Sequence, residues 1–182
     1  ISGTNFRPVD NKTISFGLNA IKNVGSKALD QIVEARDKHG KFDSLFDFTA
    51  NVSLKSVNRK VLESLNMAGA LDGLEGNRAQ KYAVIETALK YGQTIQENKA
   101  RNQVDLFGAS STNGQDISMV PSLPQIEEWS EPQLLENEKE VLGMYLSGHP
   151  LLKYAEDLEE FSNFDFTEFS HTYFYKTITK SY

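Results

Sequence analysis

The residues with the clearest chemical potential lie around Gly25, which interrupts an apolar helical pattern between Lys22 and Lys27. A tight turn between packed helices needs glycine where a side chain would clash, and it leaves the first N–H groups of the second helix without intrahelical acceptors. Those donors, the helix dipole and the flanking lysines together form a site for one phosphate. We therefore predict sequence-independent contact with duplex DNA at this turn. The predicted contact residues are Lys22, Asn23, Val24, Gly25, Ser26 and Lys27.

A second copy of this pattern is predicted 44 residues later. The matching residues are Leu18, Ile21, Val24 and Gly25 in the first copy and Leu62, Leu65, Ala68 and Gly69 in the second. Two helix-hairpin-helix units explain such a repeat. In the second copy Asp72 replaces Ala28 and no lysine stands beside Gly69, so packing is favoured there and DNA contact at Gly69 is the alternative. For either glycine, a simple helix C-cap that binds nothing is a further alternative.

A short linear motif runs from Gln103 to Phe107, with the sequence QVDLF, directly before a stretch rich in Gly, Ser, Asn and Pro. The adjacent Leu-Phe pair suits an apolar pocket on a partner protein, and the amide of Gln103 suits a small polar subsite beside it. The residues predicted to bind this partner are Gln103, Asp105, Leu106 and Phe107. The alternative is that Leu106 and Phe107 fold back onto the helical domain as its last apolar contact.

Apolar residues at helical spacing indicate that most of the chain is helical. Asn77 is the predicted N-cap of one long helix that reaches Ala100, and Ser130 forms a predicted capping box with Gln133 in a helix that stops at Gly148. The fold prediction is mainly α, with a tandem helix-hairpin-helix bundle. The predicted units are a connecting segment at 1–15, the DNA-binding hairpin domain at 16–101, the linear motif and a flexible linker at 102–128, a helical segment at 129–161 and the start of a truncated β domain at 162–182.

Charge is divided unevenly along the 182 residues. The net charge is −6, yet residues 1–101 hold 15 Lys and Arg against 11 Asp and Glu, whereas residues 102–182 hold 4 against 14. Only the first half suits a polyanion, and its excess is small. Local geometry, rather than a broad basic field, must therefore supply any DNA contact.

The sequence has no recognisable catalytic or metal site. The absence of cysteine excludes thiol catalysis, disulfides and Cys-ligated metals. The three histidines lack metal-ligand spacing, and Glu136, Glu138 and Glu140 are interpreted as a solvated helix face. No stretch approaches the ~18 apolar residues of a membrane-spanning helix, and the first residues do not have the form of a signal peptide. We expect no cofactor and no membrane partner.

Several runs in one order resemble a single family, the alpha subunits of the bacterial replicative DNA polymerase III. The runs are ISFGLNAIKNVGSKALDQIVEAR, FDSLFDF, VNRKVLESLNMAGALDGLEGNRA, QVDLFG and EKEVLGMYLSGHPL. The match extends over about residues 5 to 160 and corresponds to the C-terminal region of that family.

The resemblance implies partners and roles. In the family, the run around Lys22 to Lys27 belongs to a helix-hairpin-helix domain that contacts duplex DNA, and the stretch matching Gln103 to Phe107 binds the beta sliding clamp. An OB-fold follows, so residues 162–182 are expected to begin a truncated OB-fold-like domain. The catalytic aspartates of the family would lie upstream, which assigns DNA polymerase activity to the parent protein alone. The resemblance also implies a bacterial cytoplasmic location and contacts with other replisome subunits.

Three functional hypotheses follow. The leading one is a noncatalytic region that binds DNA and the clamp and supports processive synthesis, because tethering raises the effective concentration of the polymerase at the primer end. The second is a protein-interaction scaffold whose hairpins only pack. The third, a repair enzyme such as a hairpin-bearing glycosylase, would need a catalytic Asp or Lys in a base-sized pocket.

Overall fold

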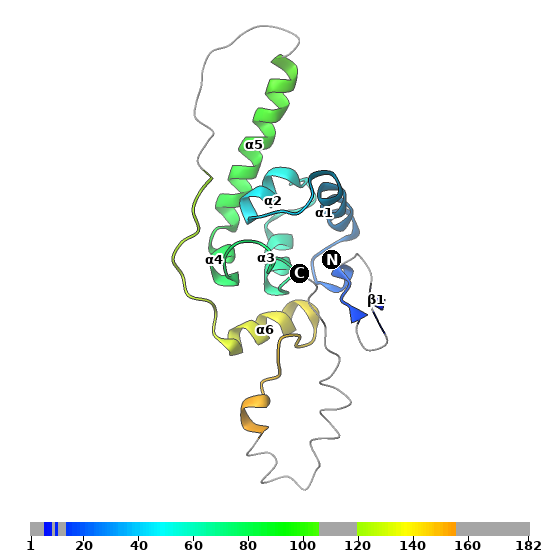
Figure 1. Cartoon of the computed structure of the whole chain (residues 1–182), viewed down its shortest axis with the longest axis vertical. Helices are drawn as coiled ribbons and strands as arrows, with labels where there is room; N and C mark the ends of the chain where they lie inside the picture. The colour runs from blue at the N-terminus through cyan, green and yellow to red at the C-terminus, as the bar shows by residue number, and fades with distance from the viewer. Residues whose placement is uncertain (1–5, 9, 11–13, 106–119, 156–182) are drawn as a thin grey trace.

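The computed structural model describes residues 6–8, 10, 14–105 and 120–155, and most of these residues are helical (Figure 1). The strands β1 (Arg7–Pro8) and β2 (Ile14–Ser15) form a short antiparallel pair. The helical elements are η1 (Leu18–Ala20), α1 (Ser26–His39), α2 (Leu45–Asn51), α3 (Arg59–Met67), α4 (Arg78–Ala83), α5 (Ile85–Asp105), α6 (Glu131–Leu142) and η2 (Leu152–Tyr154). The mainly helical prediction is confirmed. The expected β domain at 162–182 lies outside the described residues.

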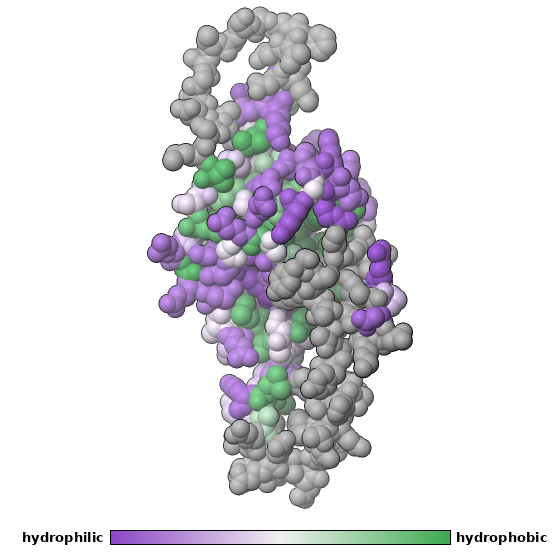
Figure 2. Space-filling model, viewed as in Figure 1, coloured by the Kyte–Doolittle hydropathy of each residue, from purple (hydrophilic) through white to green (hydrophobic). Residues whose placement is uncertain are grey.

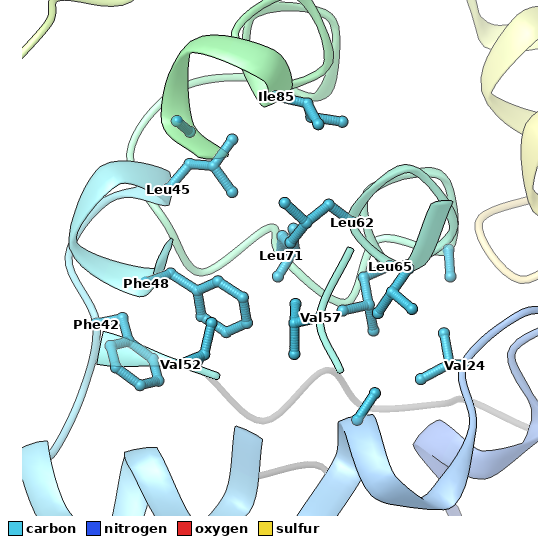
Figure 3. Packing of buried hydrophobic residues seen from close by; sticks show 14 of the residues in the cluster. Val24, Phe42, Leu45, Phe48, Val52, Val57, Leu62, Leu65, Leu71 and Ile85 are labelled. Atoms are coloured by element: carbon cyan, nitrogen blue, oxygen red, sulfur yellow. The ribbon is translucent and has the colours of Figure 1, made fainter. Parts of the chain in front are cut away.

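The hydrophobic core combines buried side chains from α1, α2, α3, α5 and α6 with side chains from the turns between them. Figure 3 shows Leu62 and Leu65 of α3 at its centre, between Val24 on one side and Phe48 on the other. Leu62 is completely buried, and full burial of a leucine stabilises a fold by about 1.5–3 kcal/mol. The core therefore fixes α3 relative to the turn that contains Val24.

Helix α5 packs along α2 through an unusually close backbone approach. A Cβ atom at Gly92 would lie 2.5 Å from the carbonyl oxygen of Thr49, so only glycine fits there. The Thr49 hydroxyl donates to the Ala88 carbonyl oxygen at 2.8 Å, and the Gln96 amide donates to the carbonyl oxygens of Thr49 and Val52 at 2.9 Å. Beyond these contacts the end of α5 extends away from the other helices (Figure 1).

The predicted N-cap at Asn77 is confirmed, but the predicted long helix is divided in two. The Asn77 side chain accepts from the Gln80 N–H, and the Gln80 side chain accepts from the Asn77 N–H, which completes a capping box. At Val84 the backbone tightens, because its N–H bonds to Lys81 three residues back, and α5 starts again at Ile85.

Residues 120–130 form an extended strap along α4, and residues 120–128 of it belong to the region expected to be a flexible linker. The Glu128 carboxylate accepts from the N–H groups of Arg78 and Ala79 at 2.9 and 3.0 Å, so it caps the first turn of α4. The amides of Asn77 and Gln80 donate to carbonyl oxygens of the strap, each at 2.9 Å. These bonds fix the strap on α4, a result that the composition of the segment does not predict. Residues 106–119 lie outside the described residues.

Helix α6 begins after Ser130 as predicted, but its ends are formed differently. The Ser130 side chain makes no capping hydrogen bond, and the Gln133 amide instead donates to Asn137 on the same helix, so the predicted capping box does not form. The helix ends at Leu142 because Gly143 adopts a left-handed conformation (φ 74°), earlier than the predicted stop at Gly148.

A buried ion network joins α6 to the turn after α3, and it overturns the interpretation of Glu138 as solvated. The Arg78 guanidinium donates to both carboxylate oxygens of Asp72 at 2.8 Å and to Glu138 at 3.0 Å. Glu138 is 0% exposed and also accepts from the N–H groups of Leu146 and Ser147 at 2.9 and 2.8 Å. One carboxylate therefore holds α6, the turn that follows it and α4 together.

Candidate nucleic-acid interface

The first hairpin turn lies between η1 and α1, as the sequence predicts, but its strained residue is Asn23 rather than Gly25. Asn23 adopts the left-handed conformation (φ 67°), which asparagine tolerates better than most residues. Gly25 is the N-cap of α1 in an ordinary extended conformation (φ −79°), and a Cβ atom there would meet nothing within 4 Å. The steric reason predicted for this glycine is therefore wrong. Nothing inside the described chain requires glycine at this position.

The start of α1 exposes a row of backbone donors. The carbonyl oxygen of Gly25 accepts from Ala28 and Leu29, but among the described residues no backbone or side-chain acceptor takes the N–H of Gly25, Ser26 or Lys27. All three of these residues are exposed, and the first turn contains no acidic side chain. Figure 2 shows a mostly hydrophilic surface over the region of α1. The positive end of the α1 dipole is therefore open to an anion.

The other predicted contact residues hold the turn in place. The Lys22 N–H donates to the Val141 carbonyl oxygen of α6 at 2.8 Å, and the Val24 N–H donates to Ile21 at 3.1 Å. The Asn23 amide donates to the Ser64 hydroxyl of α3 at 3.0 Å. Of these residues only the exposed Lys22 presents a charge to solvent. The turn is thus braced from two helices while the adjacent donors stay accessible.

Gly69 has a different structure, and the repeat at an offset of 44 residues is not a structural repeat. Gly69 (φ 75°) ends α3 in a Schellman motif, with the N–H of Gly69 bonded to Asn66 and that of Ala70 to Leu65. A Cβ atom there would lie 2.2 Å from the Arg78 guanidinium. The donors of this turn are used inside the chain. This geometry supports the packing alternative at Gly69.

The structure places a second hairpin turn 33 residues after the first, between α2 and α3. Residues 54–62, with the sequence LKSVNRKVL, align with residues 21–29, with the sequence IKNVGSKAL. Both helices begin at the same point of this alignment, Ser26 in α1 and Arg59 in α3. The buried positions also agree. They are Val24 with Val57, Ala28 with Val61, and Leu29 with Leu62.

The second turn offers the same kind of donors as the first. Asn58 is the N-cap of α3, and its side chain accepts from the Val61 N–H at 3.1 Å. In the described part of the chain no acceptor takes the N–H of Asn58, Arg59 or Lys60. Lys55 and Lys60 are exposed and stand where the first hairpin has Lys22 and Lys27.

Sequence reasoning missed the second turn because Asn58 occupies the glycine position. A signal for it exists in the matched Lys-x-Val-x-x-Lys spacing of Lys22 to Lys27 and Lys55 to Lys60. A search for paired lysines around a buried valine, instead of a search for glycine, would have found it. The second hairpin unit predicted at Leu62 to Gly69 is therefore wrong, and the structure has the matching turn at residues 54–62 instead.

The linear motif lies at the far end of α5. Gln103 and Asp105 belong to the last turn of this helix, whereas Leu106 and Phe107 lie outside the described residues. The clamp-binding prediction therefore stays a prediction. No helix among the described residues is long and apolar enough to cross a membrane. No group of three or more His, Asp or Glu residues in the described ranges is arranged to hold a metal ion.

Comparison with known proteins agrees with the hairpin geometry. A family model described as helix-hairpin-helix motif matches residues 1–81. DNA polymerase III subunit alpha from Vibrio cholerae is 39% identical over 158 residues, which are 87% of this chain and 14% of that protein. The proteins of the same name from Escherichia coli K12 and Borreliella burgdorferi are each 37% identical, over 86% and 87% of this chain and 13% and 14% of their own lengths. The chain is therefore homologous to a segment of bacterial DNA polymerase III subunit alpha, and this segment includes a helix-hairpin-helix motif.

Proposed function

We propose that the chain binds the sugar-phosphate backbone of duplex DNA through two hairpin turns, at Lys22–Lys27 and Lys55–Lys60. The observation that supports this proposal most directly is the repetition of one arrangement. In both turns three successive N–H groups lack an acceptor in the described chain, at the start of a helix, between two exposed lysines. Backbone N–H groups and lysines recognise phosphates rather than bases, so the binding is independent of sequence.

The scaffold hypothesis accounts for this arrangement less well. Hairpins that only pack would gain from a capping side chain at each helix start, by about a few tenths of a kcal/mol relative to glycine, yet the N-cap of α1 is Gly25, which has no side chain to form the bond. The glycosylase hypothesis needs a catalytic Asp or Lys in a base-sized pocket beside the hairpins. A cavity of about 370 Å³ in the described part of the chain is lined by residues between 131 and 153 and by no residue of either hairpin turn, so it does not support that hypothesis. We therefore prefer DNA binding as the function of this chain. The polymerase activity that the names of the relatives state would belong to a whole protein of that kind, not to this segment.

The DNA-binding proposal is tested by removing the lysines in pairs. Anisotropy of a short labelled duplex would be titrated with the intact chain, with Lys22→Ala/Lys27→Ala and with Lys55→Ala/Lys60→Ala, over a series of salt concentrations. Each pair should weaken binding, and it should lower the slope of log K against log salt by about 1.8, or about 0.9 for each phosphate that a lysine no longer neutralises.

The control removes two cations elsewhere. Arg101→Ala/Lys153→Ala changes the net charge equally, at exposed positions near the far end of α5, which extends away from the other helices in Figure 1, and in η2. Its affinity and salt slope should remain near those of the intact chain. Equal losses of affinity in the control and hairpin variants would refute specific contact at the hairpins.

We further propose that the motif from Gln103 to Phe107 binds a ring-shaped sliding clamp, in a cytoplasmic assembly with other replication proteins. Support comes from the composition of the motif and from its place at the end of the extending helix α5 (Figure 1). Leu106→Ala/Phe107→Ala should abolish clamp binding in a titration, while circular dichroism of the chain stays unchanged. Unchanged affinity for the clamp would remove this assignment.

A further inference from the structure

The two hairpins differ in how their cations are partnered. At the second hairpin the Arg59 guanidinium donates to Glu63 at 2.8 Å and also pairs with Glu86 of α5. Lys60 lies 3.8 Å from the other oxygen of Glu63. At the first hairpin, neither Lys22 nor Lys27 forms an ion pair in the described part of the chain.

The aligned positions show why the hairpins differ. Glu63 corresponds to Asp30 of the first hairpin, one methylene shorter and exposed. Glu86 has no counterpart there, because it comes from α5, which packs beside α3 of the second hairpin. The contacts with Glu63 and Glu86 also raise the pKa of Arg59, first through the hydrogen bond with Glu63. Two carboxylates therefore stabilise the cations of the second hairpin before any DNA is present.

We propose that Glu63 and Glu86 set the DNA affinity of the second hairpin by competing with phosphate for Arg59 and Lys60. This inference rests on the proposed DNA binding. A phosphate that approaches the α3 N-terminus must displace or share these carboxylates, and their negative charge repels it. The first hairpin holds its phosphate without such competition. The first hairpin therefore binds the duplex more tightly than the second.

The size of the effect follows from the exposure of the pairs. Arg59 and Glu86 have side chains that are 58% and 62% exposed, so the pair is screened by solvent. Exposed pairs shift an equilibrium by about two- to fivefold. Removing Glu86 should tighten duplex binding by about that factor, and removing both carboxylates should tighten it further. The gain should diminish in high salt, where the Debye length falls to about 3 Å.

The test compares Glu86→Gln and Glu63→Gln/Glu86→Gln with the intact chain in the duplex titration. Glu97→Gln is the matched control, because Glu97 is exposed on the same helix. It lies eleven residues beyond Glu86, or about 16 Å along α5, which exceeds the Debye length at 0.1 M salt. Glu86→Gln should fold normally because its side chain is mostly in solvent.

A second comparison separates competition from general charge. In an Arg59→Ala background the competition is gone, so Glu86→Gln should tighten binding much less than it does in the intact chain. The inference is overturned if Glu86→Gln has no effect, acts no more strongly than Glu97→Gln, or acts equally with and without Arg59. Absence of salt-sensitive duplex binding by the intact chain would instead overturn the proposed DNA binding, and this inference with it.

Discussion

Glu138→Gln should destabilise the chain far more than its conservative character suggests. Glu138 accepts hydrogen bonds from Arg78, from the N–H groups of Leu146 and Ser147, and from the Ser147 hydroxyl. An amide keeps one oxygen acceptor but turns the other position into a donor, which then faces groups that are donors themselves. The substitution also leaves the guanidinium of Arg78, which is 5% exposed, with Asp72 as its one carboxylate partner among the described residues.

Removal of one partner from a buried ion pair costs about 3–5 kcal/mol. Because Asp72 still holds two bonds to Arg78, we expect the lower end, about 3 kcal/mol, at neutral pH. Urea unfolding followed by circular dichroism measures the decrease in stability. Glu140→Gln on the same helix, at an exposed position, is the control and should stay within about 0.5 kcal/mol. A decrease below about 1 kcal/mol for Glu138→Gln would refute the claim that this carboxylate joins α6 to α4.

The pH dependence provides an independent measure of the same group. Burial alone would raise the pKa of Glu138, but the hydrogen bonds from Ser147, Leu146 and Arg78 outweigh burial and lower it. A carboxyl whose pKa is lower in the folded state stabilises the fold above its unfolded pKa of about 4.3, and this contribution disappears as the pH falls through the folded value. The stability difference between the intact chain and Glu138→Gln should therefore narrow below about pH 4. A constant difference would contradict the assignment.

Three glycine substitutions test the remaining geometry. Gly69→Ala should destabilise the chain by about 1–3 kcal/mol in urea unfolding, because it combines a positive φ with a collision at Arg78. Gly25→Ala should leave the unfolding free energy within about 0.5 kcal/mol but weaken duplex binding, so equal affinity would refute close approach of DNA at Gly25. Gly92→Ala should cost about 1–3 kcal/mol, because its Cβ meets the backbone of Thr49, and a neutral result would contradict the close packing of α2 and α5.

Local signals in the sequence are sufficient to predict the helical fold and the first hairpin. Asn77 has its capping partner Gln80 three residues away, so the bond that starts α4 depends only on neighbours. The pattern that predicts the turn before Ser26 is likewise contained in a few adjacent residues, although Val141 and Ser64 brace the turn in the fold. The position of both features can be predicted from the pattern alone because the residues that mark them are neighbours in the sequence.

Two of the incorrect predictions concern residues whose partners are distant in sequence. Glu138 meets Arg78 across 60 positions, and a single sequence contains nothing that distinguishes it from the exposed Glu136 and Glu140 beside it. The prediction of flexibility for the strap fails for the same reason. Glu128 of the strap caps helix α4, whose first residues lie 49 to 50 positions earlier in the sequence. Composition describes the cost of ordering a segment but not the contacts that offset it.

The two hairpins also act as an internal comparison that identifies the role of Gly25. Gly25 and Asn58 are both N-caps with nearly the same extended backbone (φ −79° and −91°), so an asparagine fits the conformation at position 25. Asn58 uses its side chain to cap α3, and a cap of this kind stabilises a helix by about 1 kcal/mol relative to alanine and by about a few tenths of a kcal/mol relative to glycine. Gly25 cannot form this bond, although neither the backbone conformation nor the internal packing at position 25 requires glycine. What glycine provides instead is an open approach to the N–H groups of α1. The hairpin with unpaired lysines is thus also the one whose backbone is most accessible, as expected if it makes the closer contact with phosphate.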